Sequence, residues 1–366
     1  MKNFILIILL LFSFSCISTK NPIKIALNSK DKKIEKIKKN INEFELQIKL
    51  TIIDSSNNFK DYSFRVNSKK YFYPASTVKL PIALFSIEKI NEIDEINLNT
   101  SFKIKDDTLT TTIREEIEKI FVISSNQSSN RLFEFLGQDY INLKLKAKGF
   151  KRARIFHRLS TANSENLISK KINFFLEDSI ITLQNKNLNP RNLKLKKLKK
   201  GKAHVKNGVL INEPMDFSRK NYISITDLHE MIKILFFPKN FDKSKTFNIS
   251  KKQLVFLKES MSKLPRDIGL DPKIYPDNYV KRFIYGDGKN ILKKNIISIY
   301  NKTGSAYGHL TETALINLKY YSVILTATIN VNGNKIYNDN IYDYKDVGIP
   351  FFAELSRKII KIVDSK

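Results

Sequence analysis

Segments with the alternating pattern of β-strands occur near both ends of this chain of 366 residues. Near the start they cover 46–53 and 62–66, and near the end they cover 297–300, 311–318 and 320–331. Helical periodicity dominates between them. This order predicts one antiparallel sheet that both ends of the chain build, flanked by helices, which is an α/β (α+β) fold.

The middle of the chain is expected to be an inserted, all-helical subdomain. We predict a single domain over 31–366, in which 31–75 and 290–366 form the α/β part and 76–289 the mainly helical part. A functional site is expected at the seam, because clefts form where layers meet. The predicted helices cover 31–44, 76–92, 112–123, 127–137, 139–148, 225–237 and 350–363.

Residues 1–16 have the pattern of an export signal, with a short basic start and an almost entirely apolar run over 4–14. Cys16, the only cysteine of the chain, follows directly. This predicts cleavage before Cys16 and its lipidation, with 17–30 as a tether to a membrane. Ordinary secretion and an uncleaved anchor are the alternatives, and each places the protein in the cell envelope or periplasm. One cysteine excludes an internal disulfide.

The formal net charge of +28 comes mainly from lysine. Such a charge attracts anionic polymers or lipid head groups. No stripe of arginine interleaved with aromatic residues marks a nucleic-acid track, so we expect no nucleic-acid partner. Lysines are densest in 185–208, which we interpret as a solvated insertion or surface hairpin. The alternative is a contact surface for an anionic component of the envelope.

The first of three short motifs is Ser76-Thr-Val-Lys79, at the start of a strongly apolar segment. A serine is a natural helix N-cap, and the helix amides behind Ser76 favour negative charge near its oxygen. Lys79 falls on the same helix face. A lysine in an apolar pocket beside a second cation loses its proton readily, so Lys79 is a candidate base for Ser76. The same pattern starting at Ser29, Ser86 and Ser260 has less suitable surroundings.

The second motif, Ser124-Ser-Asn126, separates two predicted helices, where short polar side chains are often only caps. Beside the other two motifs we interpret it as functional. Ser124 is expected to relay a proton to a leaving nitrogen. The Asn126 amide is expected to hold a substrate carbonyl and the Lys79 side chain.

The third motif, Lys302-Thr303-Gly304-Ser305, closes an alternating strand. Gly304 allows a substrate to approach the strand backbone without a side chain in the way. The Ser305 amide is expected to pair with the Ser76 amide and stabilise an oxyanion. Lys302 supplies positive charge, and the hydroxyls of Thr303 and Ser305 are expected to bind a substrate carboxylate.

These three motifs resemble those of the serine β-lactamase and penicillin-binding protein superfamily. The order of strands and helices is most similar to class A β-lactamases, over about 31–155 and 222–363. The resemblance implies that fold, a serine hydrolase acting on β-lactam amide bonds, and the roles given above. Asn130 matches a further asparagine of the family.

The chain departs from the family where the acyl-enzyme is hydrolysed. Class A enzymes use a glutamate in an E-P-x-L-N motif, which 156–221 lacks. Glu213 is the predicted substitute and Glu165 the second candidate, and a surface glutamate without a role is the alternative. Ser125 also replaces the family's aspartate. Acylation chemistry therefore looks complete, whereas deacylation chemistry does not.

Three functions remain open at this point. The first is a β-lactamase, the second a D,D-peptidase or transpeptidase acting on D-alanyl peptides of the cell wall, and the third a non-enzymatic envelope-binding lipoprotein that keeps the fold. The four histidines lack H-E-x-x-H spacing and no cysteine pair exists, so neither a metal nor another cofactor is expected.

Overall fold

The computed structural model describes residues 21–189, 192–288 and 296–364. The predicted export signal and Cys16 lie outside these ranges, as does position 290, the expected domain boundary. Among the described helices, none is long and apolar enough to cross a membrane.

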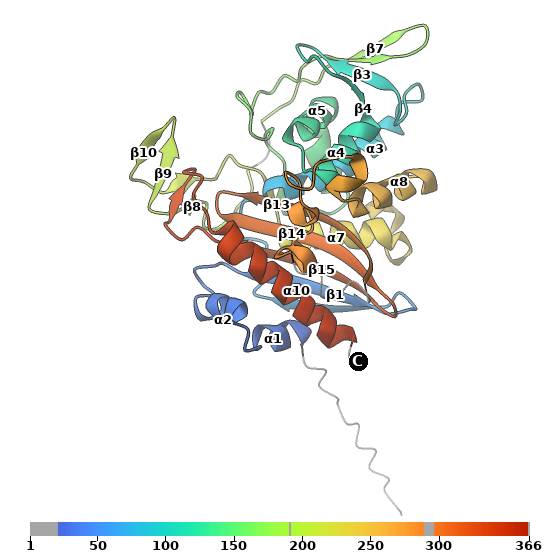
Figure 1. The fold of residues 1–366 in the computed structure, drawn as a ribbon. Helices are drawn as coiled ribbons and strands as arrows, with labels where there is room; N and C mark the ends of the chain where they lie inside the picture. The colour runs from blue at the N-terminus through green and yellow to red at the C-terminus, as the bar shows by residue number, and fades with distance from the viewer. Residues whose placement is uncertain (1–20, 190–191, 289–295, 365–366) are drawn as a thin grey trace, which may run out of the picture.

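A five-stranded antiparallel sheet contains strands from both ends of the chain, as predicted (Figure 1). The C-terminal β15 pairs with the N-terminal β1, with Gln47 opposite Thr328. The strand order places β13 at one edge of the sheet, so that its unpaired side faces the helical part. In spatial order the strands are β13 (Ile296–Ala306), β14 (His309–Leu318), β15 (Ser322–Asn330), β1 (Gln47–Ile53) and β2 (Phe59–Phe64).

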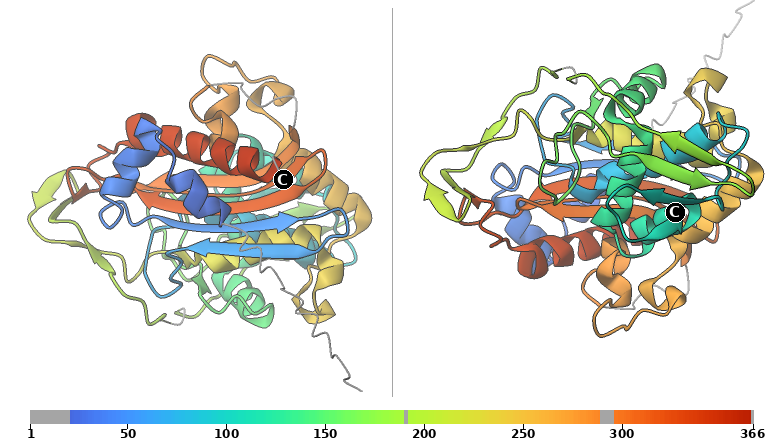
Figure 2. Two further views of the ribbon diagram at one scale, coloured as in Figure 1. Left: turned by 90° about the horizontal axis from the view of Figure 1, so that it is seen from below. Right: turned by 90° about the horizontal axis from the view of Figure 1, so that it is seen from above.

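Helices cover both faces of this sheet (Figure 2). One face packs on α1 (Pro22–Leu27), α2 (Lys32–Lys39) and α10 (Ile349–Asp364). The apolar side of α10 is continuous because Phe351, Leu355 and Ile359 recur every fourth residue. The other face packs on α3 (Lys79–Ile90), α7 (Ile225–Phe236) and α8 (Lys251–Ser262).

The expectation that 17–30 is only a tether is wrong for its second half. Residues 22–27 form α1, and Ile23, Ala26 and Leu27 are buried in the core. Asn21 caps this helix by accepting a hydrogen bond from the Ile23 amide, at 2.9 Å. The sequence analysis missed this helix because it is short and polar residues flank it. Its three buried residues have enough apolar surface to pack on the sheet.

The middle of the chain is not all-helical. The helices predicted there are present, with α4 (Ile113–Val122), α5 (Asn126–Leu136) and α6 (Gln138–Ala147) around the almost fully buried α3, whereas α8 was not among the predicted helices. A second sheet lies beside them, with antiparallel strands in the order β4 (Thr110–Thr112), β3 (Ser101–Ile104), β6 (Ile172–Phe175) and β7 (Ile180–Leu183). These strands are too short for alternation to have revealed them.

The basic insertion, 185–208, ends in a hairpin, in agreement with the prediction, but Leu193, Leu195 and Leu198 pack on the domain, so it is not solvated throughout. It contributes β8 (Lys199–Lys200) and β9 (Ala203–Lys206); β9 forms a hairpin with the next strand along the chain and also pairs with one strand far away in sequence. Their partners are β11 (Met215–Asp216), β10 (Val209–Ile211) and β16 (Ile336–Tyr337). The remaining short elements are β5 (Ala153–Arg154), β12 (Tyr222–Ile223), α9 (Arg282–Tyr285), η1 (Ala75–Val78), η2 (Pro238–Asn240), η3 (Lys243–Lys245), η4 (Pro265–Ile268), η5 (Asp277–Tyr279) and η6 (Tyr344–Gly348).

Candidate active site

Ser76 lies at the seam between the sheet and the helical part. It belongs to η1, a 3₁₀ turn that leads directly into α3, so it is not the N-cap that we expected. Its side chain is half-buried, whereas Ala75, Thr77 and Val78 around it are buried. The Thr77 hydroxyl donates to the Pro74 carbonyl at 2.6 Å and fixes the turn. Ser76 is therefore the accessible residue of a rigid turn.

Gly304 brings the edge strand against this turn. A methyl group added at Gly304 would lie 2.5 Å from the Ser76 nitrogen and 2.9 Å from the Thr77 nitrogen. We predicted that Gly304 leaves space for a substrate. The backbone of η1 occupies this space instead. The close approach sets the amides of Ser76 and Ser305 on neighbouring segments, as an oxyanion site requires.

Lys79 is buried as the first residue of α3. Its ammonium donates to Asn126 Oδ1 at 2.7 Å, and it makes a short hydrogen bond to the Ser124 carbonyl. No carboxylate pairs with Lys79 among the described residues, and burial lowers its pKa to about 7. A lysine with this pKa exists in both protonation states near neutral pH, as a proton acceptor must.

Ser124 connects two buried lysines. Lys302 Nζ donates to Ser124 Oγ at 2.8 Å, and Lys79 Nζ lies 3.4 Å from the same oxygen. Because both lysines donate hydrogen bonds to Ser124 Oγ, the hydroxyl proton of Ser124 points away from the two lysines. Burial lowers the pKa of Lys302 well below its ordinary value, and the charge of Lys79 lowers it further.

The backbone around Ser124 explains how it reaches both lysines. Ser124 has a left-handed conformation, with φ of 55°, between the end of α4 and the start of α5. The next residue, Ser125, caps α5 by accepting a hydrogen bond from the Ser128 amide at 3.1 Å. Ser125 thus has the capping role, which leaves the hydroxyl of Ser124 for the site.

Of the two hydroxyls predicted to bind a carboxylate, Ser305 is the more accessible. Thr303 is buried, and its hydroxyl donates across the sheet to the Thr311 carbonyl at 3.3 Å. Ser305 is half-buried near the end of β13.

Behind β13 lies a buried charged cluster that sequence reasoning missed. Glu312 is opposite Thr303 in the sheet, accepts a hydrogen bond from the Phe283 amide at 2.8 Å and has its pKa raised to about 7 by burial. Lys281 Nζ donates to Asn301 Oδ1 at 2.6 Å, and burial lowers its pKa to about 7. No spacing pattern links these residues, because the fold alone brings them together.

Asn130 holds the segment that faces Asn126. Its amide donates to the Leu159 carbonyl at 2.9 Å and accepts from the Leu159 amide at 2.8 Å. The next residue, Ser160, accepts a hydrogen bond from Asn126 Nδ2 at 3.1 Å. The side chain that meets Asn126 in this loop is therefore a serine hydroxyl and not a carboxylate.

The two glutamates predicted as deacylation bases lie in other surroundings. Glu165 pairs with Arg219 at 2.8 Å. Glu213 is exposed after β10, and its carbonyl accepts a hydrogen bond from the His204 ring at 2.9 Å. The described contacts link neither carboxylate to Ser76, Lys79 or Asn126. A general base must be within hydrogen-bonding reach of its proton, so the geometry gives Glu213 no support in that role.

His157 has a structural role. It is buried, stacks on Tyr73 with ring centroids 6.4 Å apart, and its pKa is lowered to about 4 by burial. No group of three or more potential metal ligands from histidine, cysteine, aspartate and glutamate was found in the described part of the chain.

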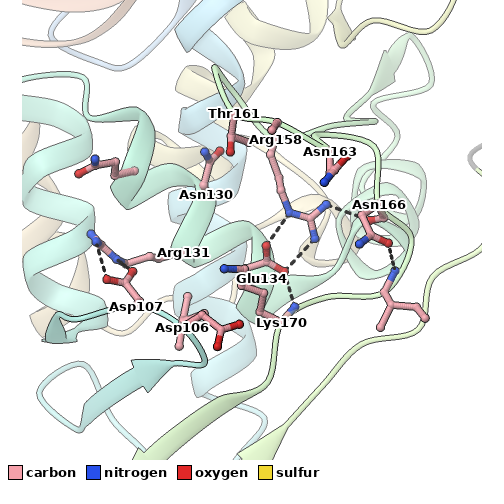
Figure 3. A pocket seen from close by; sticks show the side chains of 14 residues that line it. Asp106, Asp107, Asn130, Arg131, Glu134, Arg158, Thr161, Asn163, Asn166 and Lys170 are labelled. Atoms are coloured by element: carbon pink, nitrogen blue, oxygen red, sulfur yellow. Dashed lines mark hydrogen bonds and ion pairs between the residues drawn. The ribbon is translucent and has the colours of Figure 1, made fainter.

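A cavity of about 480 Å³ lies between the β3–β4 turn, α5 and the 158–170 loop, and Ser76, Lys79 and Lys302 are not among its lining residues (Figure 3). Arg158 forms a buried ion pair with Glu134 and fixes the loop, while Arg131 pairs with Asp107 at 2.7 Å. Asn130 lines the cavity one helical turn from Asn126. Most of the lining side chains are polar or charged, beside Ile104, Ala162 and Ile168, which suits a ligand that carries amides or hydroxyls.

Comparisons with protein families and with curated protein sequences give two findings. A family model described as the beta-lactamase enzyme family matches residues 32–246. No curated protein sequence matches the chain.

Several solved structures share the fold. A β-lactamase from Sphaerobacter thermophilus is 14% identical, with a TM-score of 0.52, and the alignment covers 94% of this chain and 97% of that one. A class A β-lactamase from Bacteroides cellulosilyticus is 12% identical, with a TM-score of 0.55 and coverage of 95% and 100%. Another, from Clostridium kluyveri, is 12% identical, with a TM-score of 0.52 and coverage of 90% and 98%. At these identities the likeness shows the fold alone.

Proposed function

The chain belongs to the beta-lactamase enzyme family, and on this premise we propose that it is an exported serine hydrolase that cleaves β-lactam amide bonds through an acyl-enzyme at Ser76. The observation that supports this proposal most is the shared hydroxyl of Ser124, which two buried lysines approach from the sheet and from α3. Such an arrangement moves protons without a histidine.

In the first step, neutral Lys79 takes the proton of the Ser76 hydroxyl, and the oxygen attacks the amide carbonyl carbon. The carbonyl oxygen becomes an anion, which the amides of Ser76 and Ser305 stabilise by donating hydrogen bonds. Lys302 contributes positive charge to the same region and orients the hydroxyl of Ser124.

In the second step, the carbon–nitrogen bond breaks and the leaving nitrogen takes the proton of the Ser124 hydroxyl. Protonated Lys79 returns its proton to Ser124, 3.4 Å away, so the proton that left Ser76 ends on the substrate nitrogen. Lys79 is neutral again, and the acyl group remains on Ser76 as an ester.

Hydrolysis of this ester needs a base for water. Ser160 occupies the place beside Asn126, and a serine hydroxyl is too weak a base for this task. Among the described residues of the site, the neutral amine of Lys79 can act as the proton acceptor. We therefore expect acylation to be fast and deacylation to be slow.

A second candidate function, a D,D-peptidase acting on D-alanyl peptides, is favoured by the cavity along α5, whose lining residue Gln127 follows Asn126 directly. Its charged and amide side chains match a peptide better than an apolar drug side chain. In this case β-lactams would inhibit the enzyme by forming a long-lived acyl-enzyme.

Intact mass spectrometry of the protein from residue 17 onward, mixed with a penicillin and followed over time, tests both functions. Ser76→Ala should abolish the adduct, whereas Ser86→Ala, which alters a buried serine with the same S-x-x-K spacing, should leave it unchanged. A transient adduct with hydrolysed drug supports the β-lactamase. A stable adduct, together with release of D-alanine from a D-alanyl-D-alanine peptide, supports the peptidase. Absence of any adduct would contradict both and favour a non-enzymatic envelope protein.

We also propose that the protein is anchored to a membrane by lipid on Cys16, on the evidence of the apolar run that precedes this residue. Cells that make the protein should incorporate labelled palmitate into it, and Cys16→Ser should remove the label. A label that persists in this variant would contradict lipidation at Cys16.

A further inference from the structure

The lysine-rich segment 192–202 is held firmly against the domain. Leu193, Leu195 and Leu198 pack on an aromatic cluster that includes Tyr71 and Phe217. Main-chain hydrogen bonds join the segment to residues 69–71, with Tyr71 N donating to Lys196 O at 2.9 Å and Lys196 N donating to Lys69 O at 2.7 Å. The lysines between these leucines are therefore carried by a fixed backbone, not by a solvated loop.

These lysines form one wall of a groove of about 710 Å³, which we call the basic groove. Its other walls are the 42–45 turn and the 330–347 segment. The walls meet at Gly201, where an added methyl group would lie 2.5 Å from the Lys335 carbonyl oxygen. Six lysines line the basic groove: Lys36, Lys197, Lys199, Lys200, Lys202 and Lys335.

Positive charge in the basic groove is only partly balanced. Three carboxylates line it, and two of them form ion pairs with lysines: Lys200 with Glu45 at 2.6 Å, and Lys335 with Glu43 at 3.8 Å. Six lysines against three carboxylates leave an excess of three positive charges. The other four lysines form no ion pair within the described residues.

The lysines are close enough to affect one another. Burial lowers the pKa of Lys200; Glu45 opposes this effect, whereas the charges of Lys70 and Lys197 add to it. Lys70 also shares Glu45 with Lys200, at 3.5 Å. Like charges gathered in a concave site weaken the folded state, and a bound anion would relieve their repulsion.

We propose that the basic groove binds a ligand carrying several phosphate groups. The groove is lined by lysines and by no arginine, and lysine binds phosphate as a point charge without paired hydrogen bonds. A phosphate group carries up to two negative charges and a carboxylate one, so linked phosphates balance the excess of lysines with fewer groups. The volume admits a few linked phosphate groups with a short organic part. Lysines on α2 and on segment 192–202 contact the ligand from two sides. This proposal does not depend on the acylation chemistry at Ser76.

Calorimetric titration of the full chain with tripolyphosphate tests the proposal. We expect the triple variant Lys36→Gln, Lys199→Gln, Lys202→Gln to weaken binding roughly 10- to 100-fold, because three exposed charge contacts are lost. The matched control changes Lys146, Lys151 and Lys239 to glutamine, which removes the same charge from exposed positions outside the groove. The control should bind as the unaltered protein does. Equal weakening in both variants, or no binding by the unaltered protein, would overturn the proposal.

Two further measurements define the ligand. Citrate, a tricarboxylate, should bind more weakly than tripolyphosphate, and stronger citrate binding would overturn the choice of phosphate. Vesicles with phosphatidylglycerol that compete with tripolyphosphate, when phosphatidylcholine vesicles do not, would identify a lipid head group as the source. Failure of both vesicles would instead support a soluble or polymeric phosphate. The melting temperature of the triple variant should not fall, since the repulsion among the lysines of the basic groove is reduced.

Discussion

Replacing Gly304 with alanine tests whether the close approach of β13 to η1 builds the oxyanion site. The new methyl group would stand 2.5 Å from the Ser76 nitrogen and 3.0 Å from the Pro74 carbonyl oxygen. Ordinary contact begins at 3.4 Å, and these are backbone atoms that cannot rotate away. The strand must therefore retreat from η1 by about 0.9 Å, which is of the order that disrupts catalytic geometry.

This retreat separates the amides of Ser76 and Ser305. Loss of one oxyanion donor slows acyl transfer by about 10²- to 10³-fold, so we expect acylation of Gly304→Ala by a penicillin to slow by that factor. Overpacking should also lower the free energy of unfolding by about 1–3 kcal/mol.

Stopped-flow measurement of acylation with a fluorescent penicillin gives the rate, and urea unfolding gives the stability. Gly149→Ala is the matched control, because its methyl group meets open space while its φ of 87° imposes a strain of about 1–2 kcal/mol. The control should lose stability and keep its acylation rate. A normal rate in Gly304→Ala, with the protein folded, would refute the assignment of the oxyanion site.

Three other predictions follow from the site. The acylation rate should rise about tenfold per pH unit below neutrality and level off above it, since Lys79, with a pKa of about 7, must lose its proton to act as the base. An acylation rate that stays constant from about pH 5 to 7 would exclude Lys79 as the base. Arg158→Ala leaves Glu134 buried without its ion-pair partner and should lower the free energy of unfolding, measured in urea, by about 3–5 kcal/mol. The double variant with Glu134→Ala should recover part of this loss. Strictly additive losses of the two single variants would contradict the coupling. Glu213→Gln should leave the lifetime of the acyl-enzyme unchanged by mass spectrometry, because this carboxylate is exposed, and a prolonged lifetime would restore Glu213 as the base.

Much of the candidate site could be predicted because its residues stand in short local motifs. Ser76 and Lys79 are separated by one turn, and Lys302 and Gly304 by two strand positions, so local geometry fixes each pair. The neighbour of Asn126 could not be predicted in this way. Ser160 reaches it through a loop that Asn130 holds, and no spacing encodes that contact. Glu312 and Lys281 were missed for the same reason.

The sheet that both ends build, the helices around α3 and the three motifs follow from local sequence patterns, because periodicity and backbone preference act over a few residues. Three features become visible only in the folded chain: Gly304 accommodates the η1 backbone, Ser124 joins two lysines, and the basic insertion forms the wall of a groove. These features depend on the burial and the close approach of distant segments, which lower the pKa of Lys79 and set the charge of the groove. Burial and approach are properties of the folded chain, so no local pattern records them.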